Sequence, residues 1–279
     1  MIPQRMTITR PYNRDVNCDQ IKDKLAEIQR YAEQGVTAQE IIAKMTQSSV
    51  MDELDKWATQ DPLMLRVKTK ICVIKDSDTD YPVLITGPTG TGKELLAKAL
   101  RIQDQPFLAV NCGGLPRDLV PSIFFGYVRG AFTGANMDKE GVLAAAKQGV
   151  VFLDEIAELP LELQATLLRA IQESEVYPIG SVNPIKIHCR FVAATKHNLR
   201  ELVNQKLFRE DLFARLYTYE IKITALLERP EDIPFISNYL GWPHPIPEDI
   251  YPDIYQFNVR AIQTYIARMK TFGYYDKTI

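Results

Sequence analysis

The stretch from Val83 to Leu96 constrains the fold more than any other part of the chain. Its sequence, VLITGPTGTGKELL, runs from an apolar, β-branched segment through a glycine-rich turn into a helix-forming segment, the order of a phosphate-binding loop. The glycines let backbone N–H groups turn inward, and Lys93 adds a positive charge at the start of the helix. An ordinary glycine-rich turn would share some of these residues, but the strand-to-helix context favours a nucleotide phosphate site. We expect that site to comprise Gly87, Pro88, Thr89, Gly90, Thr91, Gly92, Lys93, Glu94 and Leu95.

A second part of the same site is predicted where an apolar strand ends in Asp154 and Glu155, about sixty residues further on. Glu94 stands where the usual phosphate-loop pattern offers a Ser or Thr hydroxyl to Mg²⁺, so another group must hold the metal. At the carboxyl edge of the sheet, Asp154 can hold Mg²⁺ and Glu155 can polarise an attacking water. A core strand that ends in a solvated acidic turn is the alternative interpretation.

Strand and helix candidates alternate over residues 62–228, which predicts an α/β fold with a parallel sheet covered on both faces. The strand candidates are Val83–Thr86, Pro106–Val110, Val150–Leu153, Arg190–Ala194 and Tyr219–Ile223. Helices are expected between them, and a helical tail follows, with a break at 241–247. We therefore expect an N-terminal helical segment (1–61), an α/β core (62–228) and a helical lid (229–279).

The N-terminal segment shows helical patterns of its own. Asp19–Glu33 carries an apolar stripe, and after a glycine turn Thr37 can cap a second helix that runs to Met45. This order is also that of a helix-turn-helix, but Lys44 is the one basic residue of the second helix, so a helical hairpin is favoured and DNA binding stays open. A further amphipathic segment runs from Met51 to Ile74.

Composition excludes several classes of protein. A formal net charge of -2 with 24% charged residues gives no overall attraction to nucleic acid or to an anionic membrane. Four widely separated cysteines, with no C-x-x-C pair, favour neither a disulfide framework nor a zinc site. No run approaches the roughly 18 apolar residues of a membrane-spanning helix, and Met1–Arg14 lacks an apolar core. We expect a protein of the reducing cytoplasm, without a signal peptide or membrane span.

A third motif lies in the sequence FGYVRGAFTGA, which ends at Ala135. Glycines flank Phe132 there, and the surrounding residues show no helical or strand periodicity that would place this side chain in the core. Phe132 is therefore predicted at an exposed loop tip. An ordinary turn with a buried Phe is the alternative. The residues predicted to contact a partner are Gly130, Ala131, Phe132, Thr133, Gly134 and Ala135.

These motifs closely resemble the central domain of bacterial sigma-54 (RpoN) activators, a branch of the AAA+ ATPases. Gly90–Glu94 match that family's GESGTGKE loop, including the unusual glutamate, and Gly130–Ala135 match its GAFTGA hallmark. The stretch from Asp154 to Gln164 matches its Walker B strand and the following helix. The resemblance, which covers about residues 62–235, implies a three-layer AAA+ fold with a small lid. It also implies a homo-oligomeric ring, usually a hexamer, that hydrolyses ATP with Mg²⁺ to remodel sigma-54 RNA polymerase.

The resemblance implies further roles, residue by residue. Asn111 is similar to the switch residue that restrains the catalytic Glu155. Arg209 and Arg215 lie in a segment similar to the one whose arginines reach the γ-phosphate bound by the neighbouring subunit, although solvated surface arginines are the alternative. Arg260 is similar to the lid arginine that senses nucleotide.

The chain departs from the family pattern at several positions. Lys196 stands where the sensor strand has an asparagine, Val128 replaces a glutamate before GAFTGA, and Leu227 replaces an arginine. The lid's Trp-Pro-Gly-Asn has become Tyr255–Asn258. The sequence also ends soon after the lid, without the C-terminal helix-turn-helix that usually brings these activators to DNA.

We expect an ATPase whose nucleotide state sets the exposure of the Phe132 loop and thereby acts on a protein client. Sigma-54 holoenzyme is the first candidate for that client. One alternative keeps the ATPase and changes the client, for example to a mobile-element or phage replication or repair complex. The other, motivated by Lys196, is a nucleotide-gated decoy that binds sigma-54 without turnover.

Overall fold

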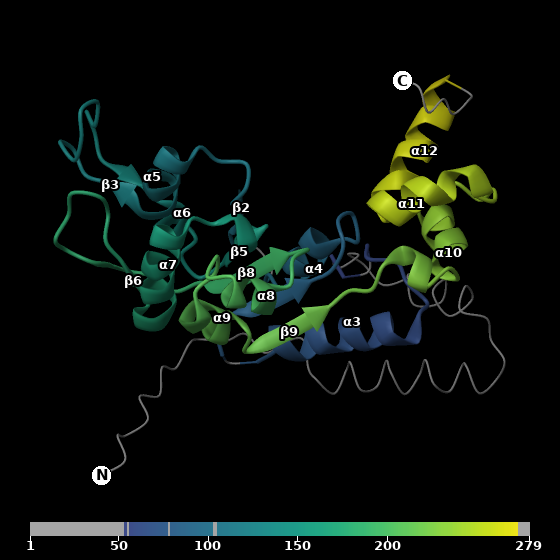
Figure 1. Cartoon of the computed structure of the whole chain (residues 1–279), viewed down its shortest axis with the longest axis horizontal. Helices are drawn as coiled ribbons and strands as arrows, with labels where there is room; N and C mark the ends of the chain where they lie inside the picture. The colour runs from purple at the N-terminus through teal and green to yellow at the C-terminus, as the bar shows by residue number, and fades with distance from the viewer. Residues whose placement is uncertain (1–52, 55, 78, 103–104, 273–279) are drawn as a thin grey trace, which may run out of the picture. The chain divides into compact units, whose positions relative to one another are not determined.

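The computed structural model describes residues 53–54, 56–77, 79–102 and 105–272 (Figure 1). The predicted helices at 19–33 and 37–45, and with them the possible helix-turn-helix, lie outside the described residues. Within the described part, no helix combines the length and apolarity needed to cross a bilayer.

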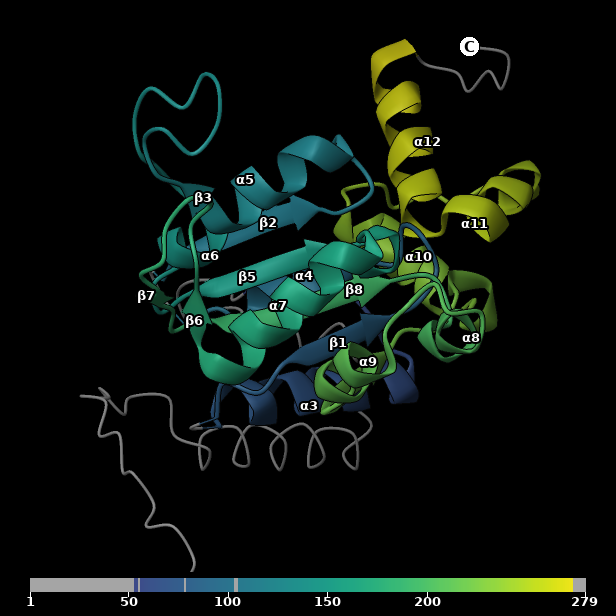
Figure 2. The same cartoon turned by 60° about the vertical axis from the view of Figure 1, so that its left-hand side comes forward.

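The centre of the fold is a five-stranded parallel sheet in the order β2-β5-β8-β1-β9 (Figure 2). Its strands are β1 (Val83–Thr86), β2 (Phe107–Asn111), β5 (Val150–Asp154), β8 (Arg190–Thr195) and β9 (Tyr219–Lys222). All five strand predictions are confirmed to within one residue at each end. The sheet places the residues after β1 and β5 at the same edge, because parallel strands share their direction.

Successive residues of the strands alternate between two apolar cores, which is why the strands are buried on both faces. Leu84, Val151 and Phe191 pack in one core, whereas Val83, Val150 and Val192 pack in the other. The first core is covered by α5 (Val120–Phe125), α6 (Val142–Ala145), α7 (Leu161–Glu173), α8 (Leu199–Asn204) and α9 (Glu210–Leu216). The second is covered by α3 (Pro62–Lys75) and α4 (Lys93–Ala99). The predicted three-layer α/β fold is confirmed.

Among the described residues, the amphipathic segment predicted at Met51–Ile74 forms a helix only in its second half. The helix begins at Pro62, because the Asp61 carboxylate caps it by accepting from the N–H of Met64 at 2.8 Å and proline is favoured at the first helical position. Residues 56–61, called the strap below, are not helical. Trp57 of the strap is nonetheless buried in the core that contains β1 and α4.

The C-terminal helices, called the lid below, pack around an apolar cluster of their own, which includes Ile233, Ile254 and Ile262. The lid consists of α10 (Asp232–Tyr239), η4 (Glu248–Ile250), α11 (Tyr251–Phe257) and α12 (Val259–Phe272), drawn green to yellow in Figure 1. The break predicted at 241–247 is confirmed, since α10 ends before it and η4 begins after it. The boundaries at 61/62 and 228/229 stay predictions.

Candidate nucleotide-binding site

The phosphate loop follows β1 and leads directly into α4, as the sequence predicts. Lys93 is 8% exposed, and its Nζ donates to the carbonyls of Gly87 and Pro88 at 2.9 and 3.1 Å. Gly90 has φ +77, and a Cβ at this position would lie 2.0 Å from the carbonyl oxygen of Phe257 in the lid. Glycine is therefore required at this position both by the backbone conformation and by the approach of the lid.

The acidic residues of the site lie at the end of β5. Asp154 pairs in register with Asn111 of β2, and its Oδ1 accepts from the N–H of Glu155 at 3.1 Å. Glu155 has φ +49, a strained left-handed conformation for a residue with a side chain, of a kind that often occurs at functional sites. The Asn111 side chain accepts from the N–H of Gly113 at 3.0 Å.

The charges of Lys93, Asp154 and Glu155 influence one another. Burial raises the pKa of Asp154, and the neighbouring Glu155 carboxylate raises it further, while Lys93 opposes both effects. Burial lowers the pKa of Lys93, although the two carboxylates oppose that shift. A cation and two carboxylates thus converge without complete mutual neutralisation, as expected for a site that takes up further charged groups.

These residues line one cavity of about 430 Å³, which is within the usual size range of small-ligand sites. Its polar end is formed by the phosphate loop, Asn111, Asp154, Glu155 and Arg260. The lid and the strap contribute Trp57, Ile236, Tyr239, Leu240 and Val259. The donor set fits a nucleotide, with a cationic cradle for phosphates and apolar side chains for a base.

The same residues can hold Mg²⁺ only together with the phosphates of a bound nucleotide. Among the described residues, no group of three or more His, Cys, Asp or Glu side chains could hold a metal ion. Magnesium in nucleotide sites needs one or two carboxylates together with substrate phosphates, which Asp154 can satisfy. Glu94, at the position of the usual hydroxyl, instead pairs with Lys98 at 2.8 Å on the exposed side of α4.

The sensor position is occupied by Lys196, which is exposed directly after β8. Its backbone N–H lies 3.4 Å from Oε2 of Glu155. Lys196 is among the residues that line a second cavity of about 460 Å³, which also includes Thr86 and Pro88 at the start of the phosphate loop. Lys196 therefore lies close to the predicted catalytic carboxylate but lines the neighbouring cavity.

The two arginines predicted to act in trans do not line the cavity of about 430 Å³ in their own chain. Arg209 precedes α9, is 43% exposed at its side chain and pairs with Asp211 at 2.6 Å, which lowers the pKa of that carboxyl group. Arg215 lies over the ring of Tyr81 at 5.7 Å. Since Tyr81 precedes β1 and the phosphate loop follows it, Arg215 lies at the opposite end of that strand.

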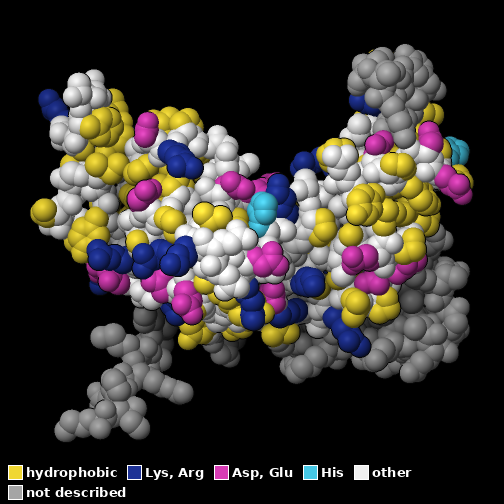
Figure 3. Space-filling view, in the orientation of Figure 1, with side chains coloured by type: hydrophobic (Ala, Val, Ile, Leu, Met, Phe, Trp, Pro, Cys, Tyr) yellow, Lys and Arg dark blue, Asp and Glu magenta, His cyan; other side chains and the backbone are white. Residues whose placement is uncertain are grey.

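The loop with the GAFTGA sequence connects β3 (Gly126–Tyr127) to β4 (Lys139–Glu140). Phe132 is 47% exposed, so the buried alternative is wrong, but its ring contacts Tyr127 edge-on at 4.9 Å, a partner that periodicity did not imply. Met137 and Val182 are also largely exposed. Figure 3 shows hydrophobic side chains gathered at the end of the molecule where Figure 1 draws β3. Phe132 is therefore accessible, and its contact with a partner stays a prediction.

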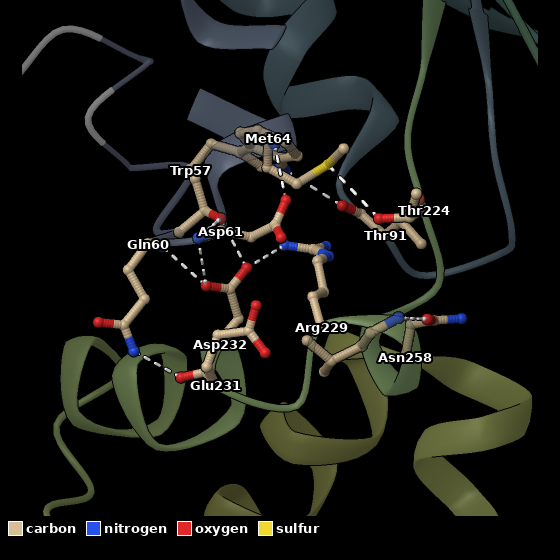
Figure 4. Close-up of polar contacts among 12 residues, drawn as sticks. Trp57, Gln60, Asp61, Met64, Thr91, Thr224, Arg229, Glu231, Asp232 and Asn258 are labelled. Carbon is tan, nitrogen blue, oxygen red and sulfur yellow. Dashed lines mark hydrogen bonds and ion pairs between the residues drawn. The ribbon is translucent and has the colours of Figure 1, made fainter. Parts of the chain in front are cut away.

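Sequence reasoning missed a buried polar network beside the phosphate loop (Figure 4). It joins the strap to the lid through Trp57, Thr59, Arg229 and Asp232. The sequence analysis assigned Trp57 and Thr59 to an amphipathic segment, and no local pattern relates them to Arg229 and Asp232. Asn258, noted above only as part of a departure from the family pattern, belongs to the same region.

Comparison with known proteins places the chain in a family. The Sigma-54 interaction domain matches residues 58–222. The transcriptional regulatory protein GlrR of Escherichia coli (strain K12) is 46% identical over 186 residues, covering 65% of this chain and 41% of GlrR. A Pseudomonas sp. (strain NS671) protein, described as an uncharacterized protein in the HyuA 5' region, is 40% identical over 223 residues, covering 74% of this chain and 75% of that protein.

A crystal structure of NtrX from Brucella abortus in complex with ATP shares the fold, with a TM-score of 0.66 and 24% identity. It covers 95% of this chain, which spans 62% of the NtrX chain. The match over residues 58–222 includes the phosphate loop, Asp154 with Glu155, and the GAFTGA sequence. This chain therefore belongs to the Sigma-54 interaction domain family and has its AAA+ fold.

Proposed function

We propose that this chain is an ATPase that assembles as a homo-oligomeric ring and remodels a protein client through the Gly130–Ala135 loop. The observation that carries the proposal is the single cavity in which Lys93, Asp154, Glu155 and Arg260 come together. Membership of the Sigma-54 interaction domain family supports sigma-54 RNA polymerase as the client. ATP as the nucleotide is supported by NtrX, a protein of the same fold whose crystal structure is in complex with ATP.

Within one subunit, Lys93 would bind the phosphates, since its ammonium lies among loop residues whose backbone N–H groups contribute to the same positive field. Asp154 would hold Mg²⁺. When bound, this ion neutralises the negative charge that develops on the phosphoryl oxygens. Glu155 would orient and polarise the attacking water, with Asn111 of the neighbouring strand restraining it until the client is engaged. Arg260 would sense nucleotide from the first turn of α12.

The ring supplies what one subunit lacks. Arg209 and Arg215 do not line the cavity of their own chain, which agrees with a role in a neighbour's site. Arginines that act in trans stabilise the charge of the transferred phosphoryl group and commonly raise the rate by about 10³- to 10⁵-fold. Arg209 is exposed, so its guanidinium can exchange Asp211 for a phosphate at small free-energy cost.

The enzymatic half of the proposal is tested by ATP hydrolysis. We expect turnover that rises with protein concentration, because neighbouring subunits complete each site. Glu155→Gln should bind ATP but hydrolyse it about 10²- to 10⁴-fold more slowly, the usual contribution of a general base. Arg209→Ala should lose turnover while retaining ATP binding. A parent protein that remains monomeric at high concentration with ATP and Mg²⁺ refutes the ring.

The client is tested by a pull-down of purified sigma-54 in the presence of an ATP transition-state analogue. We expect capture that depends on the analogue and is lost in Thr133→Ala, which alters the GAFTGA loop far from the nucleotide cavity. Failure to capture sigma-54 in every nucleotide state, with hydrolysis intact, favours the remodeller of another client.

A second candidate function is a nucleotide-gated decoy that binds sigma-54 without turnover. It is favoured by Lys196, which stands at the sensor position and is among the residues that line the neighbouring cavity. Sigma-54 capture by a parent protein that hydrolyses no ATP would support the decoy. Recovery of turnover in Lys196→Asn would then identify the lysine as the cause.

A further inference from the structure

Three consecutive carbonyls of the phosphate loop accept hydrogen bonds from outside the loop. The donors come from the lid and from the strap, two segments that lie far apart in the sequence. The bonds are Asn258 Nδ2 to Thr89 O at 3.0 Å, Val259 N to Gly90 O at 3.1 Å and Trp57 Nε1 to Thr91 O at 3.1 Å.

These bonds determine which way the loop's N–H groups point. In a planar trans peptide, the carbonyl of one residue and the N–H of the next point in opposite directions. Holding the Thr91 carbonyl against Trp57 therefore directs the N–H of Gly92 to the other side of the loop. A phosphate is bound by the orientation of such N–H groups, so an outside donor can set the affinity for phosphate without touching the ligand.

Trp57 is closely fitted to this position. Its side chain is 4% exposed, and a Cβ on Gly92 would lie 2.6 Å from its Nε1. The guanidinium of Arg229 lies 5.7 Å from the centre of the indole ring on the lid side. The indole is therefore held by packing, and its N–H has little freedom to leave the Thr91 carbonyl.

The strap that carries Trp57 is itself fastened to the lid mainly through one carboxylate (Figure 4). Asp232 accepts from the Thr59 hydroxyl at 2.6 Å, from the Gln60 N–H at 2.7 Å and from Arg229 Nη1 at 2.5 Å. The Arg229 and Asp232 side chains are 2% and 0% exposed. Strap, lid and phosphate loop thus form one connected polar network.

We propose that Trp57 is a positioning residue for nucleotide phosphates, which acts through the Thr91 carbonyl and is held in place by the docking of the strap on Asp232. The inference rests on the proposed function, since it assigns a role toward the same nucleotide. It also makes phosphate affinity sensitive to any event that pulls the strap from the lid.

The test compares the same substitution at the two tryptophans of the chain. Trp57→Phe keeps an aromatic ring and removes the bond to Thr91. Trp242→Phe is the matched control, because the Trp242 Nε1 is buried with no hydrogen-bond partner among the residues the structure describes. The full chain is titrated calorimetrically with ADP and with adenosine, which share the base but not the phosphates.

We expect Trp57→Phe to weaken ADP binding by about three- to tenfold more than it weakens adenosine binding, the difference that one hydrogen bond accounts for. Trp242→Phe should change neither. Hydrogen exchange of the peptide covering residues 88–95 should also accelerate in ligand-free Trp57→Phe and not in Trp242→Phe.

Unchanged ADP affinity in Trp57→Phe, or an equal loss for ADP and adenosine, overturns the inference and leaves the proposed function standing. A parent protein that binds no ADP refutes the proposed function and the inference with it. If Trp57→Phe does not give a cooperative melt, Thr59→Val decides, since it removes the side-chain bond from the strap to Asp232 and keeps the indole. It should also weaken ADP binding selectively, and unchanged ADP affinity in that variant overturns the inference.

Discussion

Replacing Asp232 is expected to destabilise the protein far more than replacing any exposed acid. Asp232→Ala leaves the Arg229 guanidinium buried, and the Nε of that arginine already has no hydrogen-bond partner within the described residues. Stranding one member of a buried ion pair costs about 3–5 kcal/mol. The Thr59 hydroxyl and the Gln60 N–H lose their acceptor as well. For a unit of this size, the loss corresponds to a fall in Tm of roughly 6–20 °C.

The assay is thermal unfolding followed by circular dichroism, with urea titration as a second measure of the free energy of unfolding. Asp211→Ala is the matched control, because Asp211 also pairs with an arginine, at 2.6 Å, but with 43% and 46% of the two side chains exposed. Exposed pairs contribute little, so its melting temperature should equal that of the parent. If Asp232→Ala also has the Tm of the parent, the claim that burial makes this ion pair costly to break is refuted.

Three further predictions concern titration and ligand binding. Asp154→Asn should raise the Tm of the ligand-free protein at pH 7. The pKa of Asp154 is raised in the folded state, so ionisation of this carboxyl group destabilises the folded state as the pH rises, and asparagine does not ionise. The gain in Tm should vanish below pH 3.8, the ordinary pKa of aspartate, where the carboxyl group is protonated in both states. Burial raises the pKa of Cys112 and Cys189 to about 12, so iodoacetamide at pH 8 should modify the partly exposed Cys72 faster, as peptide mass spectrometry can show. ATP at 100 times its Kd should stabilise the parent by about 2.7 kcal/mol and leave the Tm of Lys93→Ala unchanged.

The sheet and the core of the site were predictable from sequence because their signals are local. Val150–Asp154 is a short apolar run with two β-branched residues, which favours a strand buried on both faces, and its last residue is the predicted metal ligand. The phosphate loop likewise joins its strand and helix within a few residues, so Lys93 could be placed without knowledge of the rest of the chain.

The strap network could not be predicted because its partners are distant in the sequence. Thr59 and Asp232 are 173 residues apart, and Asn258 and Thr89 are 169 residues apart. Nothing in a pattern of period 2 or 3.6 relates such positions. The orientation of Arg215 toward Tyr81 was missed for the same reason, since helical spacing gives its face of α9 but not what that face contacts.

We infer that the main role of the buried Arg229–Asp232 pair is to fix which strap residues bond to the lid. Stability alone does not require the pair, because two apolar side chains of similar volume could stabilise the fold equally well. Donors from three successive strap residues, Thr59, Gln60 and Asp61, converge on one carboxylate, and a slip by one residue would leave at least one of them unsatisfied. The resulting register of the strap places the indole of Trp57 opposite the Thr91 carbonyl. Asp232→Asn, which keeps the shape of the side chain, should therefore weaken ADP binding, although Asp232 does not line the nucleotide cavity. Unaltered ADP affinity in folded Asp232→Asn would show that the pair stabilises the lid and has no part in positioning the loop.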